Sequence, residues 1–193
     1  MTTTGSTPAP SALDGSALCF ECGLCCDGTL FPSLVVHIPE RDFAVSLGLP
    51  VREDPDGGFV APLPCSAFVD GCCSLYEVGR PMTCASYECG VLTEYTAGHV
   101  GRAASRAVIG LMRSVAHDLE VEMGLAPGTY TMEAMARFLT EHQPWGAPER
   151  YRRFLIAFHQ FDTVGLEHFG RTARPDEVRA SAAGARLAAV AGP

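Results

Sequence analysis

The sequence of 193 residues contains no lysine, no run of basic residues and no long apolar stretch. Without lysine, no side-chain amine is available for Schiff-base chemistry. With a net charge of −8 and no cluster of Lys and Arg, the chain lacks the positive surface that neutralises nucleic-acid phosphates. A membrane-spanning helix needs about 20 mainly apolar residues, and the N-terminus lacks the basic start and apolar run of a signal peptide. We therefore expect a cytoplasmic protein that binds neither nucleic acid nor membrane.

Cysteine is absent from the second half of the chain, because all nine cysteines lie between Cys19 and Cys89. Three interpretations compete: a disulfide framework, a set of buried free thiols, and metal ligation. The odd number of cysteines, the expected reducing compartment and the close C-x-x-C spacings weigh against disulfides. The tight grouping weighs against isolated buried thiols, which act as small hydrophobic residues. Metal ligation is the interpretation that accounts for both observations.

The cysteines form two groups in the sequence. The first is the stretch CFECGLCC, which contains Cys19, Cys22, Cys25 and Cys26. The second is more widely spaced and contains Cys65, Cys72, Cys73, Cys84 and Cys89. A C-x-x-C turn can point two thiolates at one ion, and eight thiolates would fill two four-sulfur sites, or one site plus a cluster. One cysteine is then left over, and Cys72 and Cys73 are the candidates.

Two adjacent cysteines end the first group. Neighbouring side chains usually diverge, so Cys25 and Cys26 are suited to serve two centres, or one centre and a separate thiol. Ligation by thiolates alone suits zinc and iron–sulfur clusters alike. The spacing departs from the bacterial ferredoxin pattern, because the fourth cysteine directly follows the third. The radical-SAM spacing C-x3-C-x2-C also fails, because Thr29 occupies its last position. The spacing therefore leaves both metals open.

Two motifs together resemble the YkgJ-like cysteine-cluster family, which is described as zinc- or iron-chelating. The first is C-x-x-C-G-x-C-C at residues 19–26, and the second is C-S-L-Y-E followed by R-P-M-T-C at residues 73–84. Cys65 matches the isolated cysteine of that family, and the resemblance covers residues 17–92. The extra Cys72 and a longer spacer between Tyr76 and Arg80 depart from the pattern.

The resemblance implies a ligand set in which Cys73, which carries the C-S-L-Y pattern, is preferred to Cys72. The implied metal ligands are Cys19, Cys22, Cys25, Cys26, Cys65, Cys73, Cys84 and Cys89. One relative, the flagellin lysine-N-methylase, links its cysteine cluster to an iron–sulfur centre, which favours iron–sulfur over zinc. His37 is the first alternative ligand, and Arg80 is a candidate hydrogen-bond donor beside the ligands.

The expected fold is mainly α, a single small domain whose cysteine-rich loops are irregular and organised by metal, with at most short strands. We expect a disordered tail over 1–15, the metal-binding region over 16–95, a helical region over 96–172, and a terminal helix or frayed tail over 173–193. Apolar residues at helical spacing predict a long helix over 96–123 that Gly124 closes; they are Val100, Ala104, Val108, Leu111, Val115 and Leu119. Thr131 is expected to cap a second helix. Pro148 is expected to begin a third, with Tyr151, Phe154, Leu155 and Phe158 on one face. A short strand at 33–37, a short helix at 39–48 and a strand before Cys65 are also expected.

Three functions follow from these expectations. The first is an iron–sulfur protein with a redox or electron-transfer role. The second is a zinc-stabilised structural or adaptor module whose helical half contacts a protein partner. The third is a metalloenzyme related to the methylase, which would need an open coordination position and a cosubstrate pocket. The sequence carries no glycine-rich nucleotide motif and assigns no catalytic residue, so the iron–sulfur interpretation comes first.

Overall fold

The computed structural model describes residues 14–55, 57–141 and 148–170. In chain order its elements are α1 (Ser16–Cys22), β1 (Ser33–Val36), the 3-10 helix η1 (Ile38–Glu40), α2 (Arg41–Ser46), β2 (Arg52–Glu53), β3 (Phe59–Pro62), β4 (Phe68–Val69), β5 (Cys72–Cys73), α3 (Met82–Ser86), α4 (Gly90–Thr96), α5 (Arg102–Met123), α6 (Met132–Glu141) and α7 (Pro148–Phe169). The described part is mainly α with short strands, as predicted. The expected tail over 1–15 falls almost wholly outside the described residues, and the expected terminal helix over 173–193 falls wholly outside them.

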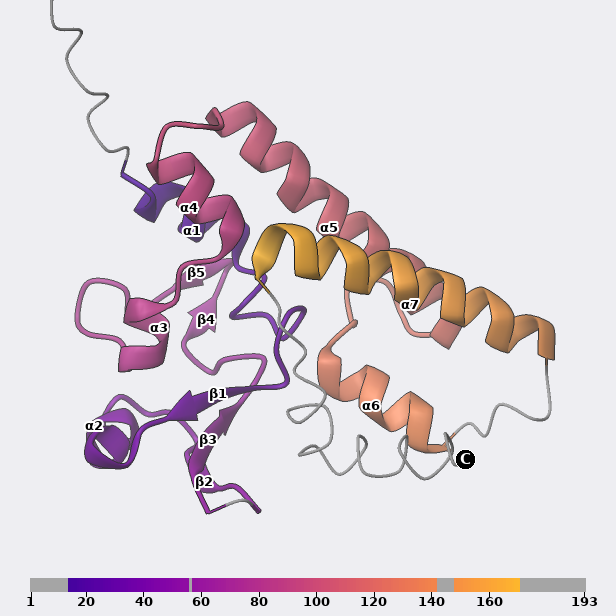
Figure 1. Ribbon diagram of the computed structural model, residues 1–193. Helices are drawn as coiled ribbons and strands as arrows, with labels where there is room; N and C mark the ends of the chain where they lie inside the picture. The colour runs from indigo at the N-terminus through magenta and orange to yellow at the C-terminus, as the bar shows by residue number, and fades with distance from the viewer. Residues whose placement is uncertain (1–13, 56, 142–147, 171–193) are drawn as a thin grey trace, which may run out of the picture.

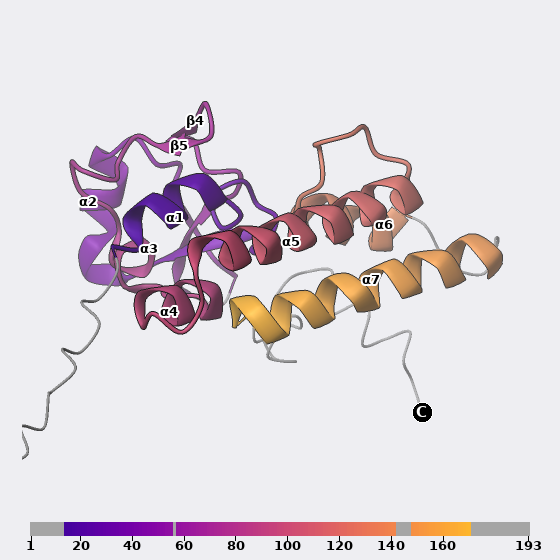
Figure 2. The same ribbon diagram turned by 90° about the horizontal axis from the view of Figure 1, so that it is seen from above.

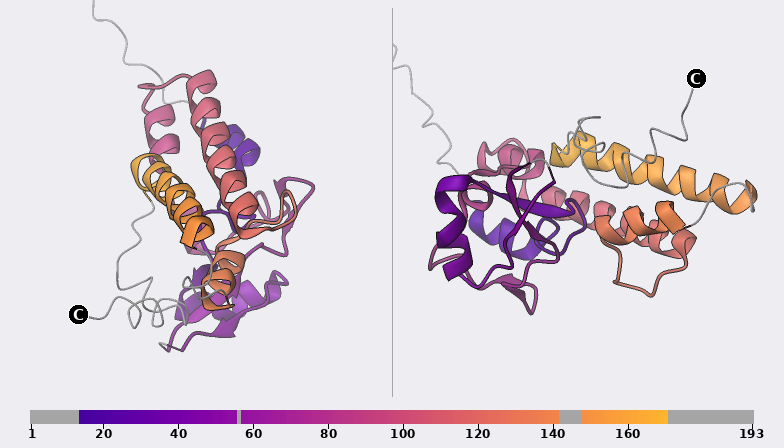
Figure 3. Two further views of the ribbon diagram at one scale, coloured as in Figure 1. Left: turned by 90° about the vertical axis from the view of Figure 1, so that its right-hand side faces the viewer. Right: turned by 90° about the horizontal axis from the view of Figure 1, so that it is seen from below.

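Two long helices dominate the C-terminal half. Helices α5 and α7 run side by side in opposite directions (Figure 1). Helix α6 shares the first core with the C-terminal part of α5, the end remote from the cysteines. Figure 3 shows the same pair from the side and from below, with the cysteine-bearing elements gathered at one end of it. The helix pair therefore forms a rod, and the cysteine region packs on one end of that rod.

Helix α5 begins later than the periodicity predicts. It starts at Arg102, because residues 97–101 form a turn after α4 in which Gly98 has φ +74°. Gly124, in a left-handed conformation with φ 73°, ends α5 where predicted. The buried face also differs from the predicted one: Leu111 is 46% exposed, whereas Met112 is fully buried. The apolar periodicity fixed the helix type, and the position of α7 decided which side is covered.

The starts of α6 and α7 agree with the sequence. Thr131 caps α6, since its side-chain oxygen accepts a hydrogen bond from the N–H of Ala134 at 3.0 Å. Pro148 is the first residue of α7, where its missing N–H costs nothing. Of the aromatic and apolar stripe expected on α7, Phe154 is buried, but Leu155 is 44% exposed.

The described residues form two hydrophobic cores. The first core lies among α1, α4, α5, α6 and α7 and consists of Leu18, Leu24, Leu30, Val91, Ile109, Met112, Val115, Ala116, Leu119, Met123, Tyr130, Met135, Phe154, Ala157, Phe161 and Phe169. The second core lies between the sheet and α2 and consists of Leu34, Val36, Ala44, Leu49, Ala61 and Ala67. The first core is therefore large and rich in aromatic residues, and the second is small.

The second core is covered by a three-stranded antiparallel sheet in the order β1-β3-β2. Val36 lies opposite Phe59, and Arg52 lies opposite Val60. The predicted strand at 33–37, the short helix that ends near Gly48 and the strand before Cys65 are confirmed. The expectation of irregular loops needs correction, because α1 and α3 are helices that carry cysteines. Gly23 supplies the left-handed residue that ends α1, so the segment before it can complete two helical turns.

Candidate metal centre

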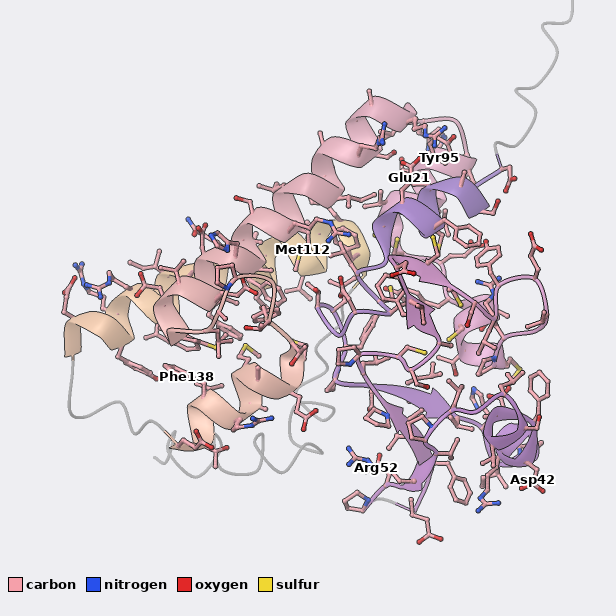
Figure 4. The ribbon with its side chains drawn as sticks, turned by 180° about the vertical axis from the view of Figure 1, so that it is seen from behind. Glu21, Asp42, Arg52, Tyr95, Met112 and Phe138 are labelled. Atoms are coloured by element: carbon pink, nitrogen blue, oxygen red, sulfur yellow. The ribbon has the colours of Figure 1, made fainter. Side chains whose placement is uncertain are left out.

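The sulfur atoms of the cysteine region gather between α1, the β4–β5 hairpin and α3 (Figure 4). Cys19 and Cys22 lie on α1, Cys25 and Cys26 in the loop that follows, Cys65 before β4, Cys72 and Cys73 on β5, Cys84 on α3, and Cys89 at the N-terminal boundary of α4. All nine thiols are free, and only Cys19 and Cys72 are exposed. The fold thus brings together cysteines that are up to 70 residues apart in the chain.

Helix α1 and Gly23 set the position of the first cysteines. Cys19 and Cys22 are three residues apart, so they share one face of the helix. The N–H of Gly23 donates to the carbonyl oxygen of Cys19 at 3.2 Å, and Gly23 has φ 62°. A Cβ at Gly23 would lie 2.5 Å from the ring of Phe68. Glycine is therefore required here both by the backbone conformation and by the close approach of β4.

Backbone hydrogen bonds join the loop after α1 to the segment before β4. The N–H of Cys26 donates to the carbonyl of Gly23 at 2.8 Å, which closes a tight turn. The carbonyl of Cys26 in turn accepts a hydrogen bond from the N–H of Cys65 at 2.8 Å. This bond fixes Cys26 and Cys65 as neighbours although the sequence separates them widely.

The β4–β5 hairpin gives Cys72 and Cys73 different exposure to solvent. Its turn residues Asp70 and Gly71 both have positive φ, 51° and 77°, which is the conformation of a two-residue type I′ turn. Successive side chains on a strand point to opposite faces, and Cys72 is exposed whereas Cys73 is half-buried. The Asp70-Gly71 dipeptide is a strong sequence signal for such a hairpin.

Cys84 and Cys89 lie close in sequence but belong to different cores. Helix α3, which carries Cys84, is tied to the sheet, because the hydroxyl of Thr83 donates to the carbonyl of Val35 at 2.8 Å. Cys84 packs against the second core, and Cys89 packs against the first. Between them the hydroxyl of Tyr87 donates to the carbonyl of Phe169, at the end of α7, at 2.5 Å.

Four cysteines line a common cavity beside the first core, and we call them the first quartet: Cys19, Cys22, Cys25 and Cys89. Cys19 also lies near Cys26 and Cys73. Burial, followed by the nearby Cys89 and Cys19, raises the pKa of Cys22 to about 12. Burial also raises the pKa of Cys25 well above its usual value, followed by the effects of Cys22 and Cys89. Cys19 is the most accessible member, but burial still raises the pKa of its thiol.

The other four cysteines meet beside the second core, and we call them the second quartet: Cys26, Cys65, Cys73 and Cys84. Burial raises the pKa of Cys26 to about 12, and the nearby Cys73, Cys65 and Cys84 act in the same direction. For Cys84, burial and then Cys65 and Cys73 raise the pKa to about 11. With pKa values of about 11–12, the thiols of Cys22, Cys26 and Cys84 are protonated at neutral pH. A bound cation would favour their ionised form.

Arg80 lies close to both quartets. Its guanidinium stacks over the ring of Tyr76, 3.9 Å from the centroid, and this ring lies 4.2 Å from that of Phe20. Burial is the main influence on the pKa of Cys19 and of Cys84, and the positive charge of Arg80 opposes it at both thiols. The charge of Arg80 is thus held by aromatic stacking at the boundary between the quartets.

A small cavity of about 50 Å³ adjoins the first quartet. All four cysteines of the quartet line it, together with Cys26 and apolar side chains that include Leu18, Leu24, Ile109 and Phe169. A single water needs only about 10–15 Å³ measured in this way. The space beside the first quartet is thus larger than one ion or water requires.

The donor set fits a thiolate-bound metal by its chemistry. Both quartets contain sulfur donors only, the ligand type that zinc and iron–sulfur clusters share. In the described rotamers, among residues 14–55, 57–141 and 148–170, no three Cys, His, Asp or Glu side chains converge closely enough to hold an ion. Metal binding therefore requires the cysteine side chains to turn inward. The alternative ligand His37 is exposed and caps η1 together with Glu40.

Comparison with known proteins adds no relative. No family model matches the chain, and neither the curated proteins nor the solved structures include a significant match. No helix in the described part of the chain combines the length and apolar character needed to cross a membrane.

Proposed function

We propose that this protein binds metal through its clustered cysteine thiolates and holds an iron–sulfur cluster with a redox or electron-transfer role. The observation that carries the proposal is the gathering of eight cysteines from several segments, while Cys72, the ninth, faces outward. Metal ligation explains this gathering, because buried free thiols act as small hydrophobic residues and do not need to lie next to one another. An iron–sulfur cluster, once bound, supplies the ability to accept and release single electrons.

The cavity beside the first quartet favours a cluster over a single ion at that position. A lone tetrahedral zinc ion lies directly among its four sulfurs, whereas a cluster also brings inorganic sulfide and additional iron atoms. The apolar lining by Leu18, Leu24 and Ile109 would shield such a group from water. Shielding of this kind tunes the reduction potential of a cluster.

Zinc remains the second candidate, and the size of the second core favours it at the second quartet. That core contains six buried residues, of which three are alanines. A structural zinc site contributes about 10–16 kcal/mol of apparent binding energy at neutral pH, which is large compared with what so small a core provides. Because zinc binding would contribute more stability than the small second core, a zinc-stabilised module is the second proposed function.

The raised thiol pKa values give the proposed binding a definite pH dependence. Each cysteine must lose its proton to act as a ligand, so loading releases protons and acid competes with metal. Because burial places the pKa values of Cys22 and Cys26 at about 12, this competition extends across the neutral range. We expect metal affinity to rise with pH between about pH 6 and pH 8.

Anaerobic purification followed by iron, zinc and acid-labile sulfide analysis tests the proposal. We expect iron and sulfide in amounts comparable to the polypeptide, with a brown colour that air bleaches. A colourless, air-stable protein that contains zinc would support the zinc-stabilised module instead. Protein that carries neither metal, and that takes up neither after reconstitution under reducing conditions, would refute metal binding altogether.

A further inference from the structure

We infer that the chain holds two separate metal centres, one bound by Cys19, Cys22, Cys25 and Cys89 and the other by Cys26, Cys65, Cys73 and Cys84. This inference rests on the proposed metal-binding function and goes beyond it, because the sequence left open whether one or two sites exist. It also implies that the adjacent residues Cys25 and Cys26 serve different centres.

The two hydrophobic cores separate five of the eight cysteines independently of any electrostatic consideration. Cys22, Cys25 and Cys89 pack against the first core, whereas Cys65 and Cys84 pack against the second. A side chain held by one core cannot move to the far side of the other without unpacking its own helix or strand. Each core thus provides the rigid support for one set of ligands.

The turn after α1 sends the two adjacent cysteines to different cores. Cys25 packs on the first core next to the buried Leu24. The carbonyl of Cys26 accepts a hydrogen bond from the N–H of Cys65, which packs against the second core. Consecutive Cα atoms are about 3.8 Å apart, so one peptide bond would connect the two centres, and neither thiol needs to reach across.

Cys19 and Cys73 complete the two sets. Cys19 lies on α1, three residues before Cys22, so the two side chains share one face of that helix. It lines the cavity with Cys22, Cys25 and Cys89, which Cys26 of the second set also reaches. Cys73 lies on β5 opposite Phe68, and the N–H of Phe68 donates to the carbonyl of Cys65 at 2.9 Å. Each set then consists of four sulfurs, the number that closes a structural zinc site or holds a four-cysteine cluster.

Titration of the reduced, metal-free protein with Co²⁺ alone measures the number of sites, because tetrahedral cobalt–thiolate coordination absorbs visible light. We expect the wild-type protein to take up about two equivalents, since eight thiolates form two four-ligand sites. The variant Cys89→Ser should retain about one equivalent, and so should Cys84→Ser. The control Cys72→Ser alters a cysteine outside both sets and should retain the wild-type number. A wild-type protein that binds about one equivalent, abolished by either substitution, would overturn the inference.

A labelling experiment on the wild-type protein avoids the risk that a variant fails to fold. The metal-loaded protein, as purified, is exposed to increasing chelator, and alkylation of each cysteine is followed by peptide mass spectrometry. We expect Cys72 to be alkylated from the start and the other cysteines to lose protection in two groups of four, with Cys25 and Cys26 in different groups. Simultaneous loss of protection by all eight, or loss by Cys25 and Cys26 together, would overturn the inference.

The two proposals fail in distinguishable ways. If the wild-type protein binds no metal under any condition, the proposed function fails. If it binds metal at a single site, the proposed function stands and only the division into two centres fails.

Discussion

The two hydrophobic cores of this protein differ in how much stability their packing provides. The first core buries Phe154, Phe161 and Phe169 almost completely between two 22-residue helices. The second core relies on three aliphatic residues and three alanines under a short sheet. Burial of a large apolar side chain contributes about 1.5–3 kcal/mol, and an alanine contributes far less. The comparison teaches that packing supplies much more stability to the helical part than to the sheet part.

The boundary between the two parts is nevertheless tight. Helices α1 and α4 lie beside the start of α5 and the end of α7 (Figure 2). Glu21 on α1 pairs with Arg102 and with Arg106 of α5, the latter at 3.0 Å, and Arg113 donates to the carbonyl of Cys22 at 2.6 Å. A Cβ at Gly90 would lie 2.7 Å from the carbonyl oxygen of His168. The first quartet is therefore built into the contact between the parts, and the second quartet lies beyond it.

Removal of metal should give the largest difference in stability between the sheet part and the helical part. We expect chelation of the reduced protein to abolish hydrogen-exchange protection of β1–β3 and α3 while α5 and α7 keep most of theirs. The reason is that a metal site worth about 10–16 kcal/mol exceeds what the second core supplies, whereas the first core retains its packing. Exchange measured by mass spectrometry with and without chelator checks this, and restored zinc or iron serves as the control. Equal loss of protection in both parts would contradict the difference between the cores.

A cavity in the first core should destabilise the helical part and leave metal binding intact. Phe161→Ala removes a fully buried ring that lies 5.2 Å from the ring of Tyr130. We expect the free energy of unfolding to fall by about 3–5 kcal/mol, with the amount of bound metal unchanged. Chemical denaturation and metal analysis measure the two quantities. The control Leu155→Ala lies on the exposed side of the same helix and should cost within about 0.5 kcal/mol. Loss of metal together with stability in Phe161→Ala would show that the parts are not separable.

Gly23→Ala tests the turn that directs Cys25 and Cys26. Adoption of φ 62° by alanine costs about 1–2 kcal/mol, and the new methyl group would also collide with Phe68. Gly48→Ala is a matched control, because Gly48 has φ +79° but no atom within 4 Å of its Cβ position. We expect a larger loss of stability, measured by thermal denaturation, in Gly23→Ala than in Gly48→Ala, and weakened metal binding in Gly23→Ala alone. Equal metal affinity in the two variants would refute the role of Gly23 in placing the ligands.

Arg80→Gln should give the smallest effect. A unit charge near a surface thiolate contributes about 1 kcal/mol at 4 Å in water, so we expect metal affinity to fall about fivefold. Arg41→Gln is the control, since Arg41 also stacks on an aromatic ring, that of Phe59 at 5.2 Å, without influencing a described cysteine pKa. Competition with a chelator measures both affinities. An equal change in the two variants would show that Arg80 acts through stacking alone.

Local signals in the sequence predicted much of the fold. Thr131, Pro148 and Gly124 mark helix ends correctly, because caps act through neighbouring backbone groups. The extension of α5 back to residue 96 was wrong, since apolar periodicity does not reveal a turn whose residues are also partly apolar. The buried face of α5 was shifted as well, because the sequence does not state where α7 will lie.

The cysteines of the candidate site could be named from the sequence, but which of them become neighbours could not. The number of cysteines and their spacing indicate sulfur ligation, and the divergence of Cys25 and Cys26 follows from their adjacency. The assignment of Cys84 and Cys89 to different cores has no counterpart in the sequence, where only four residues separate them. The preference for Cys73 over Cys72 came from a resemblance, and the Asp70-Gly71 turn supplies a physical reason for it.

The sequence by itself determined the presence of nine closely spaced thiols, the mainly helical character of the second half and the ends of several helices. These properties depend on the residue type and on neighbours within one or two turns of chain. Only the tertiary structure decided which thiols become neighbours, because Cys26 meets Cys65 and Cys25 meets Cys89 through the packing of two separate cores. Contacts across such distances depend on how all the intervening elements pack, and local propensity carries no information about that.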